Sequence, residues 1–448
     1  MRLNSQEEQK DKFIESQGVM LSRIDSRLFL WGLFLLQLFL IGAILRFSVI
    51  SGPSHEPSVD SNIKFINRNS DRRTLRPGAV NEGILMVQLG NFTQIFAETP
   101  FTSLVRRGPV TCFREGTVTE ADGTVGVDSN DTDDVRCRCH PEWHGPDCGQ
   151  PEVIWRAFVA GRIPLNFTSS HTVRHRVIYF IQSTVVSLQL LEVQMMELMD
   201  IVELFVVCDL MEMITLRKST LFTTHRQRIL LMHHRECNPA QIYDYLINKL
   251  PKTAALRDDD VIIFSHLDQI FNRKAINYFK WYKNWPQPVR FRLKYNVYGF
   301  FWQHPASTVV SGFACYHSVF RDHPRDTLNR LLTIDKAAMI VGDLNHFGGW
   351  QCQFCAQPID IVKRLEYEFQ HEHFTFDSNT RKIIDVGHVQ NLITKGFYVD
   401  GQMKLNKVQR FGDKYYTPNY VEQNSWNFDN IITNIYAHWE EESDDEYL

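Results

Sequence analysis

The sequence lacks any excess of basic residues. Its 48 Lys and Arg residues stand against 52 Asp and Glu residues, and its formal net charge is −4 at pH 7. Nucleic-acid-binding domains usually carry a basic surface, so this balance argues against a nucleic-acid partner. Internal repeats are also lacking. A chain of 448 residues exceeds the usual size of one hydrophobic core, and we expect one large domain with smaller attachments.

One stretch lacks charge altogether. Residues 28–45, LFLWGLFLLQLFLIGAIL, contain one polar side chain, Gln37, and as a helix they would span roughly 27 Å of hydrocarbon. A cleaved signal peptide is the alternative interpretation. However, the run is longer than a usual signal-peptide core and no clear small-x-small cleavage site follows it. The pattern therefore favours an uncleaved transmembrane anchor.

The charges around this run predict its orientation. Five basic residues precede it, whereas only Arg46 follows closely, so the positive-inside rule places residues 1–27 in the cytosol as a tail. The rest of the chain would then be lumenal or extracellular. Three N-glycan acceptor triplets and all the cysteines follow the run, which agrees with that side. The acceptor asparagines are Asn91, Asn130 and Asn166.

Residues 46–110 show no sustained periodicity and are typical of a stem. A cysteine-rich module follows over residues 111–151. Its C-x-C-x8-C spacing, with an aromatic residue and a glycine before the last cysteine, resembles the C-terminal half of an EGF-like module. That resemblance implies the pairs Cys112–Cys137 and Cys139–Cys148. A disulfide-stabilised spacer is favoured over a receptor-binding module, because so small a module has little core of its own.

The strongest alternation of strands and helices lies in residues 172–420. Residues 177–182 and 201–209 are β-rich runs, and residues 187–200 between them carry apolar side chains at helical spacing. Strand, helix and strand in this order predict a right-handed crossover and a parallel sheet. Residues 261–264, VIIF, predict a further buried strand. Residues 421–448 form a C-terminal segment with an acidic, solvated tail.

A candidate ligand site follows this last strand. Ligands of open parallel sheets bind beyond the carboxyl ends of strands, where Asp268 lies. A carboxylate there is typical of a divalent metal that holds a diphosphate, and His266, two residues earlier, is a candidate second ligand. An ordinary turn is the alternative. Asp258, Asp259 and Asp260 precede the strand and are better explained by a solvated loop.

Two further segments carry aromatic residues that suit a sugar or a base. Tyr298 and Trp302 lie in a strand-rich run over residues 289–312, and Trp350 lies in HFGGWQCQFC, residues 346–355. Core packing is the alternative explanation for the aromatic residues of the first run. Cys352 and Cys355 lack a second C-x-x-C pair, so a disulfide or buried thiols are favoured over a zinc site. The sequence leaves open the pairing of these two cysteines and of Cys208, Cys237 and Cys315.

Taken together, these motifs resemble glycosyltransferase family 17, the β-1,4-mannosyl-glycoprotein 4-β-N-acetylglucosaminyltransferases. The resemblance covers about residues 110–402. It rests on residues 137–151 (CRCHPEWHGPDCGQP), 190–209 (LLEVQMMELMDIVELFVVCD), 259–270 (DDVIIFSHLDQI), 297–305 (VYGFFWQHP) and 346–355 (HFGGWQCQFC), which occur in the family's order, with GFYVDG near the end.

The resemblance implies an inverting, single-pass type II Golgi membrane enzyme. It would transfer N-acetylglucosamine from UDP-N-acetylglucosamine, with Mn²⁺, in β-1,4 linkage to the core mannose of N-glycans on glycoproteins. The implied fold is α/β: a GT-A-like nucleotide-sugar-binding domain with a mostly parallel sheet, an N-terminal transmembrane helix and the EGF-like module. Asp268 would be the main metal ligand, with His266 and His346 as candidates. The general base is unassigned, and Asp385 and Asp343 are weak candidates.

The chain also departs from the family at strand ends. Where the family has a cluster of acids of the Asp-Asp-Ala-Asp-Glu kind, this sequence reads Ser-His-Leu-Asp-Gln over residues 265–269, and only Asp268 is kept. After Cys208-Asp209 it lacks the family's polar Ser-Asn-x-Thr stretch. The framework motifs persist. The alternative hypothesis is therefore a catalytically impaired membrane protein that binds a glycan or a nucleotide; adhesion through the cysteine module is a third.

Overall fold

A computed structural model describes residues 35–37, 63–65, 85–88, 104–107, 110–120, 124–129, 135–164, 174–182, 187–209, 219–233, 237, 240, 242–244, 246, 256–321, 337–370 and 382–437. The chain divides into two units, Met1–Asn62 and Ile63–Leu448, and each is considered by itself. In the first unit only a short helical piece, residues 35–37, is described. No helix in the described part of the chain is long and apolar enough to span a membrane.

Several predictions fall outside the described residues. The anchor predicted over residues 28–45 lies outside the described residues except for residues 35–37. Most of the stem and the acidic tail also lie outside them. The three acceptor asparagines, Asn91, Asn130 and Asn166, also lie outside.

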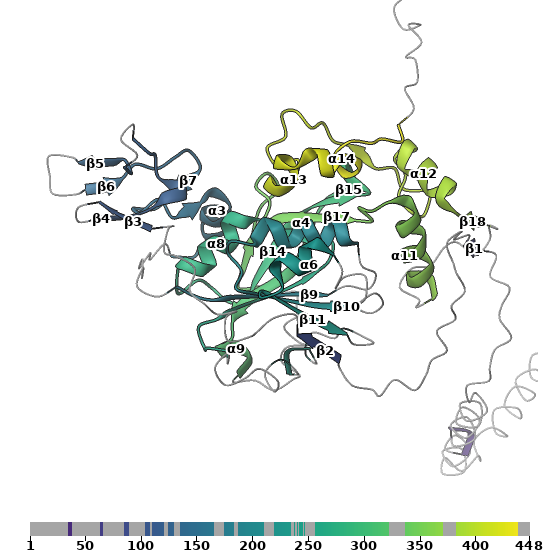
Figure 1. Ribbon diagram of the computed structural model, residues 1–448, viewed down its shortest axis with the longest axis horizontal. Coiled ribbons are helices and arrows are strands. Elements are labelled where there is room, and N and C mark those ends of the chain that lie inside the picture. The colour runs from purple at the N-terminus through teal and green to yellow at the C-terminus, as the bar shows by residue number, and fades with distance from the viewer. Residues whose placement is uncertain are drawn as a thin grey trace, which may run out of the picture. The chain divides into compact units, whose positions relative to one another are not determined.

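One mixed sheet organises the second unit (Figure 1). Its strand order is β13-β17-β14-β15-β12-β9-β10-β11-β2, with β16 paired to β14 and β19 paired to β15. The strands are β2 (Leu85–Gln88), β9 (Val177–Gln182), β10 (Leu204–Asp209), β11 (Ile229–His233), β12 (Val261–His266), β13 (Gln269–Phe271), β14 (Val289–Val297), β15 (Gly299–Tyr316), β16 (Met339–Val341), β17 (Gly349–Gln353) and β19 (Asn406–Lys407).

The parallel sheet predicted from the strand-helix-strand pattern is confirmed for β12, β9, β10 and β11, which pair in parallel in that order. The rest of the sheet is mixed, so the prediction of a mostly parallel sheet is only partly correct: β14 pairs in parallel with β16 and β17, but other pairs are antiparallel. β15 runs antiparallel to both β12 and β14, and β2 runs antiparallel to β11. Only Tyr298, with φ +65°, separates β14 from β15. So short a connection can join only antiparallel strands.

Alternate side chains of the parallel strands belong to two separate hydrophobic cores, one on each face of the sheet. Tyr179 and Ile263 belong to one hydrophobic cluster, which includes residues of the helices α3, α4 and α8. Their neighbours Phe180 and Ile262 belong to a second cluster, which includes Cys237 and Leu246. Successive side chains of a strand point to opposite faces, so the continuously apolar runs mark strands buried on both sides.

The helices of the second unit lie around this sheet (Figure 1). The helix predicted over residues 187–200 is observed as α4, Leu188–Leu198. It begins after Ser187, whose side chain accepts the Leu190 N–H. The helices are α3 (Glu152–Ala160), α4 (Leu188–Leu198), α6 (Thr220–His225), α8 (Arg273–Trp281), α9 (Ser318–Arg321), α11 (Pro358–Gln370), α12 (Val386–Lys395), α13 (Asn419–Gln423) and α14 (Asp429–Ile432), with the 3-10 turns η2 (Arg114–Gly116) and η4 (Ser425–Asn427).

A third cluster packs around the end of the β14–β15 hairpin. It joins Tyr298 and Phe354 to apolar side chains of α11 and α12, including Leu365 and Ile393. Beside it, β18 (Lys382–Ile384) pairs in parallel with β1 (Ile63–Phe65). This cluster fixes α11 next to the hairpin, which matters for the candidate site below.

The described part of the cysteine-rich module contains short strands, the turn η2 and two disulfides. Cys112 pairs with Cys137 and Cys139 pairs with Cys148, as the resemblance implied. Its strands are β3 (Leu104–Arg107), β4 (Val110–Phe113), β5 (Val127–Ser129), β6 (Val135–Cys137), β7 (Trp143–His144) and β8 (Gln150–Pro151). Disulfides stabilise such modules by restricting the unfolded chain.

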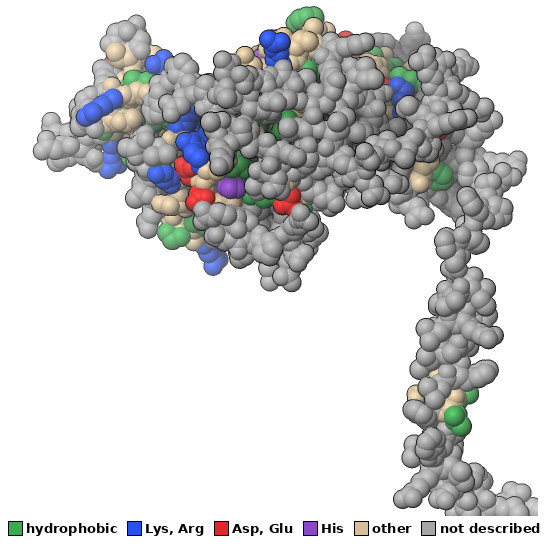
Figure 2. Space-filling view, turned by 60° about the horizontal axis from the view of Figure 1, so that its bottom comes forward, with side chains coloured by type: hydrophobic (Ala, Val, Ile, Leu, Met, Phe, Trp, Pro, Cys, Tyr) green, Lys and Arg blue, Asp and Glu red, His purple; other side chains and the backbone are tan. Residues whose placement is uncertain are grey.

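This module contacts α8. Arg273 forms an ion pair with Glu115 at 3.0 Å and another with Asp200. The Tyr282 hydroxyl, just after α8, donates to Asp147 at 2.6 Å. Figure 2 shows Lys and Arg side chains next to Asp and Glu side chains on one face of the molecule, in agreement with the near balance of charges in the sequence.

Candidate functional site

A cavity of about 350 Å³ opens at the carboxyl ends of β9 and β12. This volume is at the lower end of the range for small-molecule sites. Phe180, Phe264 and Phe313 supply part of its apolar wall. Its polar wall consists of Gln182, Ser265, His266, Gln269, Arg290 and Ser311. The cavity therefore occupies the place where open α/β sheets bind ligands.

A β-bulge shapes one side of the cavity. The register between β14 and β15 shifts between Val289 and Phe291, opposite Gly312. Gly312 has φ +71°, and a Cβ added to it would stand 2.3 Å from Cζ of Phe271. Only glycine combines that backbone angle with that close approach. The bulge places Ser311 and Arg290 at the cavity wall, as bulges near binding sites often do.

Gln194 of α4 holds the turn between β12 and β13 from the other face of the sheet. Its buried Nε2 donates to Oγ of Ser265 at 2.7 Å and to the carbonyl oxygen of Gln269 at 2.5 Å. On the cavity side, Nε2 of Gln269 donates to Oγ of Ser311 at 2.7 Å, and Oε1 of Gln269 accepts the His266 N–H at 3.0 Å. These bonds fix the turn that carries His266 and Asp268.

His266 is solvent-exposed, yet its ring lines a concave cavity with protein on most sides. This poor hydration lowers the pKa of His266; the nearby carboxylate of Asp268 acts to raise it, and Arg364 acts to lower it. The imidazole is consequently neutral at pH 7. Of the cavity-lining side chains that the structure describes, only His266 and Arg290 are ionisable.

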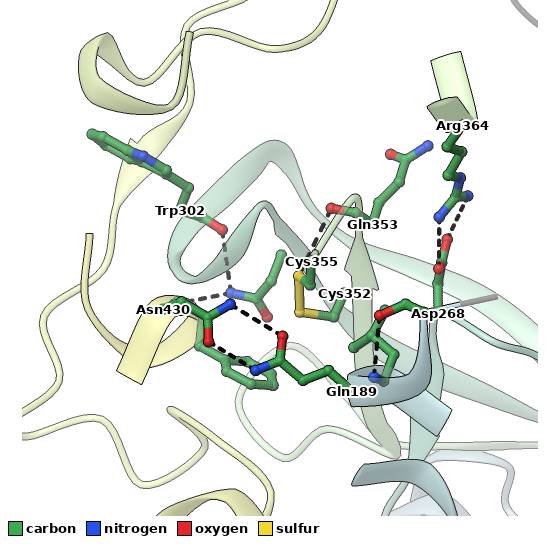
Figure 3. Close-up of a disulfide and its surroundings, with 12 residues drawn as sticks. Gln189, Asp268, Trp302, Cys352, Gln353, Cys355, Arg364 and Asn430 are labelled. Atoms are coloured by element: carbon green, nitrogen blue, oxygen red, sulfur yellow. Dashed lines mark hydrogen bonds and ion pairs between the residues drawn. A yellow bond between two sulfur atoms is a disulfide. The ribbon is translucent and has the colours of Figure 1, made fainter. Parts of the chain in front are cut away.

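Asp268 is not free to act as a metal ligand, because Arg364 of α11 donates hydrogen bonds to both of its carboxylate oxygens (Figure 3). Nη1 donates to Oδ1 at 2.8 Å and Nη2 donates to Oδ2 at 2.7 Å. The same guanidinium lies over the Phe354 ring, 4.8 Å from its centroid, and its Nε donates to Glu368 at 2.7 Å. The carboxylates raise the pKa of Arg364 against the effect of burial.

The C-x-x-C segment supports this pair. Cys352 and Cys355 form a disulfide, and the Cys352 N–H donates to the carbonyl oxygen of Asp268 at 2.7 Å (Figure 3). The disulfide predicted as one alternative is thereby confirmed. Cys208 and Cys237 form another disulfide, and Cys315 is a free, buried thiol.

The described residues do not fit the Mn²⁺ ion that the resemblance implies. No group of three His, Cys, Asp or Glu side chains that could hold a metal ion occurs in the part of the chain that the structure describes. At the cavity, no carboxylate accompanies His266 among the described lining side chains, whereas protein sites for Mn²⁺ usually contain carboxylates. The carboxylate of Asp268 is already held by Arg364.

His346 does not join His266 and Asp268. Asp268 bonds to Cys352 near the end of β17, whereas His346 precedes the beginning of that strand. Its Nδ1 lies 3.3 Å from Asp343, and its ring makes an edge contact with Tyr415. The three predicted metal ligands are therefore divided between the two ends of β17.

The three predicted pocket aromatics are also dispersed. Tyr298 is buried in the third cluster, and the Trp302 Nε1 donates to the carbonyl oxygen of Ile393 at 2.8 Å. Trp350 donates to the carbonyl oxygen of Tyr415 at 2.9 Å and lines a separate cavity of about 90 Å³. None of the three lines the cavity at β9 and β12.

The two candidate bases have local partners. Asp385 caps α12 by accepting the His388 N–H at 2.7 Å. Asp343 accepts the N–H groups of Asn345 and His346, each at 2.7 Å, and these bonds lower its pKa although burial acts to raise it. Neither carboxylate lines the cavity.

Sequence reasoning missed Arg290, Gln194 and Arg364. Gln194 had a usable signal, since it is a polar residue within the apolar stripe of a predicted helix, and such residues are buried only with partners. Arg290 alternates with apolar neighbours in its strand, as Arg292 does, so the pattern could not separate them. Arg364 carried no signal, because its partner lies 96 residues away.

Comparison with known proteins adds family-level information. Residues 167–428 match the family model described as glycosyltransferase family 17. The chain is 26% identical over 352 residues to the β-1,4-mannosyl-glycoprotein 4-β-N-acetylglucosaminyltransferases of Mus musculus and Homo sapiens. The match covers 67% of this chain and 62% and 63% of those proteins, so less than two thirds of their length is spanned. No solved structure matches the chain.

Proposed function

The chain belongs to glycosyltransferase family 17, and from this premise we propose that it transfers N-acetylglucosamine from UDP-N-acetylglucosamine to the core mannose of N-glycans in β-1,4 linkage. Support comes from the names of the curated relatives and from the polar cavity at the carboxyl ends of β9 and β12. That cavity is the observation on which the proposal rests, because it gives a family member a polar site at the expected edge of its sheet. The nucleotide-binding fold would be of the GT-A kind.

The chemistry assigned to the cavity is an inverting displacement. The acceptor hydroxyl oxygen bonds to the anomeric carbon of the donor sugar as the bond from that carbon to the β-phosphate oxygen breaks. The electron pair of the broken bond goes to UDP. The hydroxyl proton goes to the neutral ring of His266, which is the cavity's candidate general base. Mn²⁺ stays a prediction, and no step is derived through it.

The topology follows the same proposal. A type II anchor over residues 28–45 would place the second unit in the Golgi lumen, where glycoprotein acceptors pass. Support comes from the uncharged run, the basic residues before it and the disulfides of the second unit, which persist in oxidising compartments.

A transfer assay tests the activity. The full-length chain, purified in detergent, would be incubated with UDP-N-acetylglucosamine and a free N-glycan acceptor, with EDTA or with MnCl₂. We expect a product heavier by one N-acetylhexosamine, with its linkage assigned by NMR. No transfer in either buffer, over a panel of N-glycan acceptors, would refute the proposal.

A glycan- or nucleotide-binding protein without catalysis is the second candidate. The observation that favours it is the occupied carboxylate of Asp268 in place of the family's acidic cluster. Calorimetry distinguishes the two. Binding of UDP or of an N-glycan without any transfer would favour the binding protein.

A further inference from the structure

We propose that the cavity holds the donor diphosphate without a divalent cation, and that Arg290 supplies the positive charge that a metal ion would otherwise supply. This inference rests on the proposed function and adds to it the mode of donor recognition. It comes from three observations: the occupation of Asp268, the chemistry of the remaining cavity side chains, and the position of Arg290.

The occupation of Asp268 is built into the fold. Its side chain is 8% exposed and that of Arg364 is 18% exposed, and the two hydrogen bonds between them use both carboxylate oxygens. Arg364 is itself held by Glu368 and by the face of Phe354. A metal ion on Asp268 would have to displace this guanidinium and leave it buried with one partner fewer, which is strongly unfavourable.

The other side-chain oxygens in the described part of the cavity wall are neutral. Gln182, Gln269 and Ser311 offer amide and hydroxyl groups, which bind phosphate oxygens by donating hydrogen bonds. Hard divalent cations are instead held chiefly through carboxylates, and no carboxylate lines the described part of this wall. The described part of this wall therefore suits an anion better than a cation.

Arg290 brings a guanidinium to the described part of the wall. It lies in β14 at the bulge opposite Gly312, so its side chain lines the cavity together with those of Ser311 and His266. A guanidinium stays charged at every working pH, and its planar donors match two phosphate oxygens at once. In the transfer step, Arg290 would stabilise the negative charge that develops on the departing UDP.

Isothermal titration calorimetry with UDP tests the inference on the full-length chain in detergent. We expect the Kd in EDTA to equal that in MnCl₂ within about twofold, and Arg290→Gln to raise it by about tenfold or more, as for a lost charged hydrogen bond. Arg290→Lys, which keeps the charge, should raise the Kd for UDP by less than Arg290→Gln does. Arg292→Gln is the matched control, because Arg292 lies in the same strand, donates to Thr308 at 3.2 Å and does not line the cavity.

The outcomes separate this inference from the proposed function. UDP binding that is at least tenfold weaker in EDTA than in MnCl₂ overturns metal-free recognition and leaves the transferase intact. A Kd for Arg290→Gln equal to that of Arg292→Gln, with both variants folded by thermal unfolding, overturns the role of Arg290. Binding in EDTA without any transfer refutes the transferase and keeps the diphosphate site. No UDP binding in either buffer refutes both.

Discussion

The carboxylate of Asp268 and the guanidinium of Arg364 form a two-pronged ion pair between segments 96 residues apart in the sequence. The pair fastens α11 to the turn between β12 and β13, directly behind the cavity-lining His266. Its bonds run parallel, and Phe354 and Glu368 cover the guanidinium. Asp268 therefore ties the turn that carries His266 to α11.

Asp268→Asn should destabilise the protein severely. The substitution leaves Arg364 buried with Glu368 as its only carboxylate partner in the pair's cluster, and breaking a buried pair costs about 3–5 kcal/mol. Urea unfolding measures the loss in the free energy of unfolding. Asp360→Asn is the matched control on α11, because its pair with Lys363 is 42% and 40% exposed and should contribute about 0.5 kcal/mol or less. Equal losses in the two variants would contradict the assignment.

Transfer should decline in acid because His266 must be neutral to accept a proton. Its pKa is lowered from 6.5 by poor hydration, so the neutral form persists at pH 6.5 and the rate should fall only as the pH drops further. His266→Asn should reduce kcat by about 100-fold or more and remove this acid limb. His346→Asn, which changes a histidine beyond the other end of β17, should leave the profile unchanged. An acid limb that survives in His266→Asn would exclude His266 as the base.

The parallel half of the sheet was predictable from local pattern. Residues 177–182 form β9 over the predicted range, and VIIF extends by two residues to give β12. Apolar runs of strand length, joined by an amphipathic helix, leave few alternatives once crossovers are right-handed. The mixed half was not predictable in the same way, because a single residue, Tyr298, separates β14 from β15, and the sequence reads as one continuous strand-rich run.

The candidate site was predictable only in part, for a related reason. The end of β12 was identified as the place of a site, and the cavity lies there. Which side chains meet at that place depends on contacts between distant segments, such as Asp268 with Arg364 and Gln269 with Ser311. No local periodicity encodes such pairs. Tyr298 and Trp302 are residue types that often bind sugars. However, Tyr298 is buried in the third cluster, and the Trp302 indole N–H donates to a carbonyl oxygen of α12.

Gly312→Ala should damage both stability and donor binding. The added methyl would stand 2.3 Å from the Phe271 ring, and φ +71° is unfavourable for alanine. We expect a loss of about 2–4 kcal/mol in the free energy of unfolding and a weaker affinity for UDP, because the bulge shapes the cavity wall. Gly387→Ala is the matched control. It lies in α12, its Cβ would approach only Asp385 at 3.5 Å, and alanine should stabilise the helix by about 0.5–1 kcal/mol.

Glu197 should make stability fall as the pH rises. Its carboxylate is buried at the end of α4, where its Oε2 accepts the Tyr420 N–H at 2.7 Å. Burial raises its pKa from 4.5 to about 7, against the effect of that hydrogen bond. The folded protein therefore binds this proton more tightly than the unfolded chain does. The resulting contribution to stability is complete below pH 4.5 and is lost as the pH rises through about 7.

Urea unfolding of the wild type and of Glu197→Gln at pH 4.5 and pH 8 measures this contribution, because shared titrations cancel in the difference. Relative to the variant, the wild type should lose about 3 kcal/mol between the two pH values. Glu422→Gln provides a control of opposite sign. A hydrogen bond from Arg410 lowers the pKa of Glu422, so the wild type should gain stability over that variant as the pH rises. If the wild type and Glu197→Gln differ equally at both pH values, Glu197 is ionised in the folded protein, and the hydrogen bond rather than burial determines its charge.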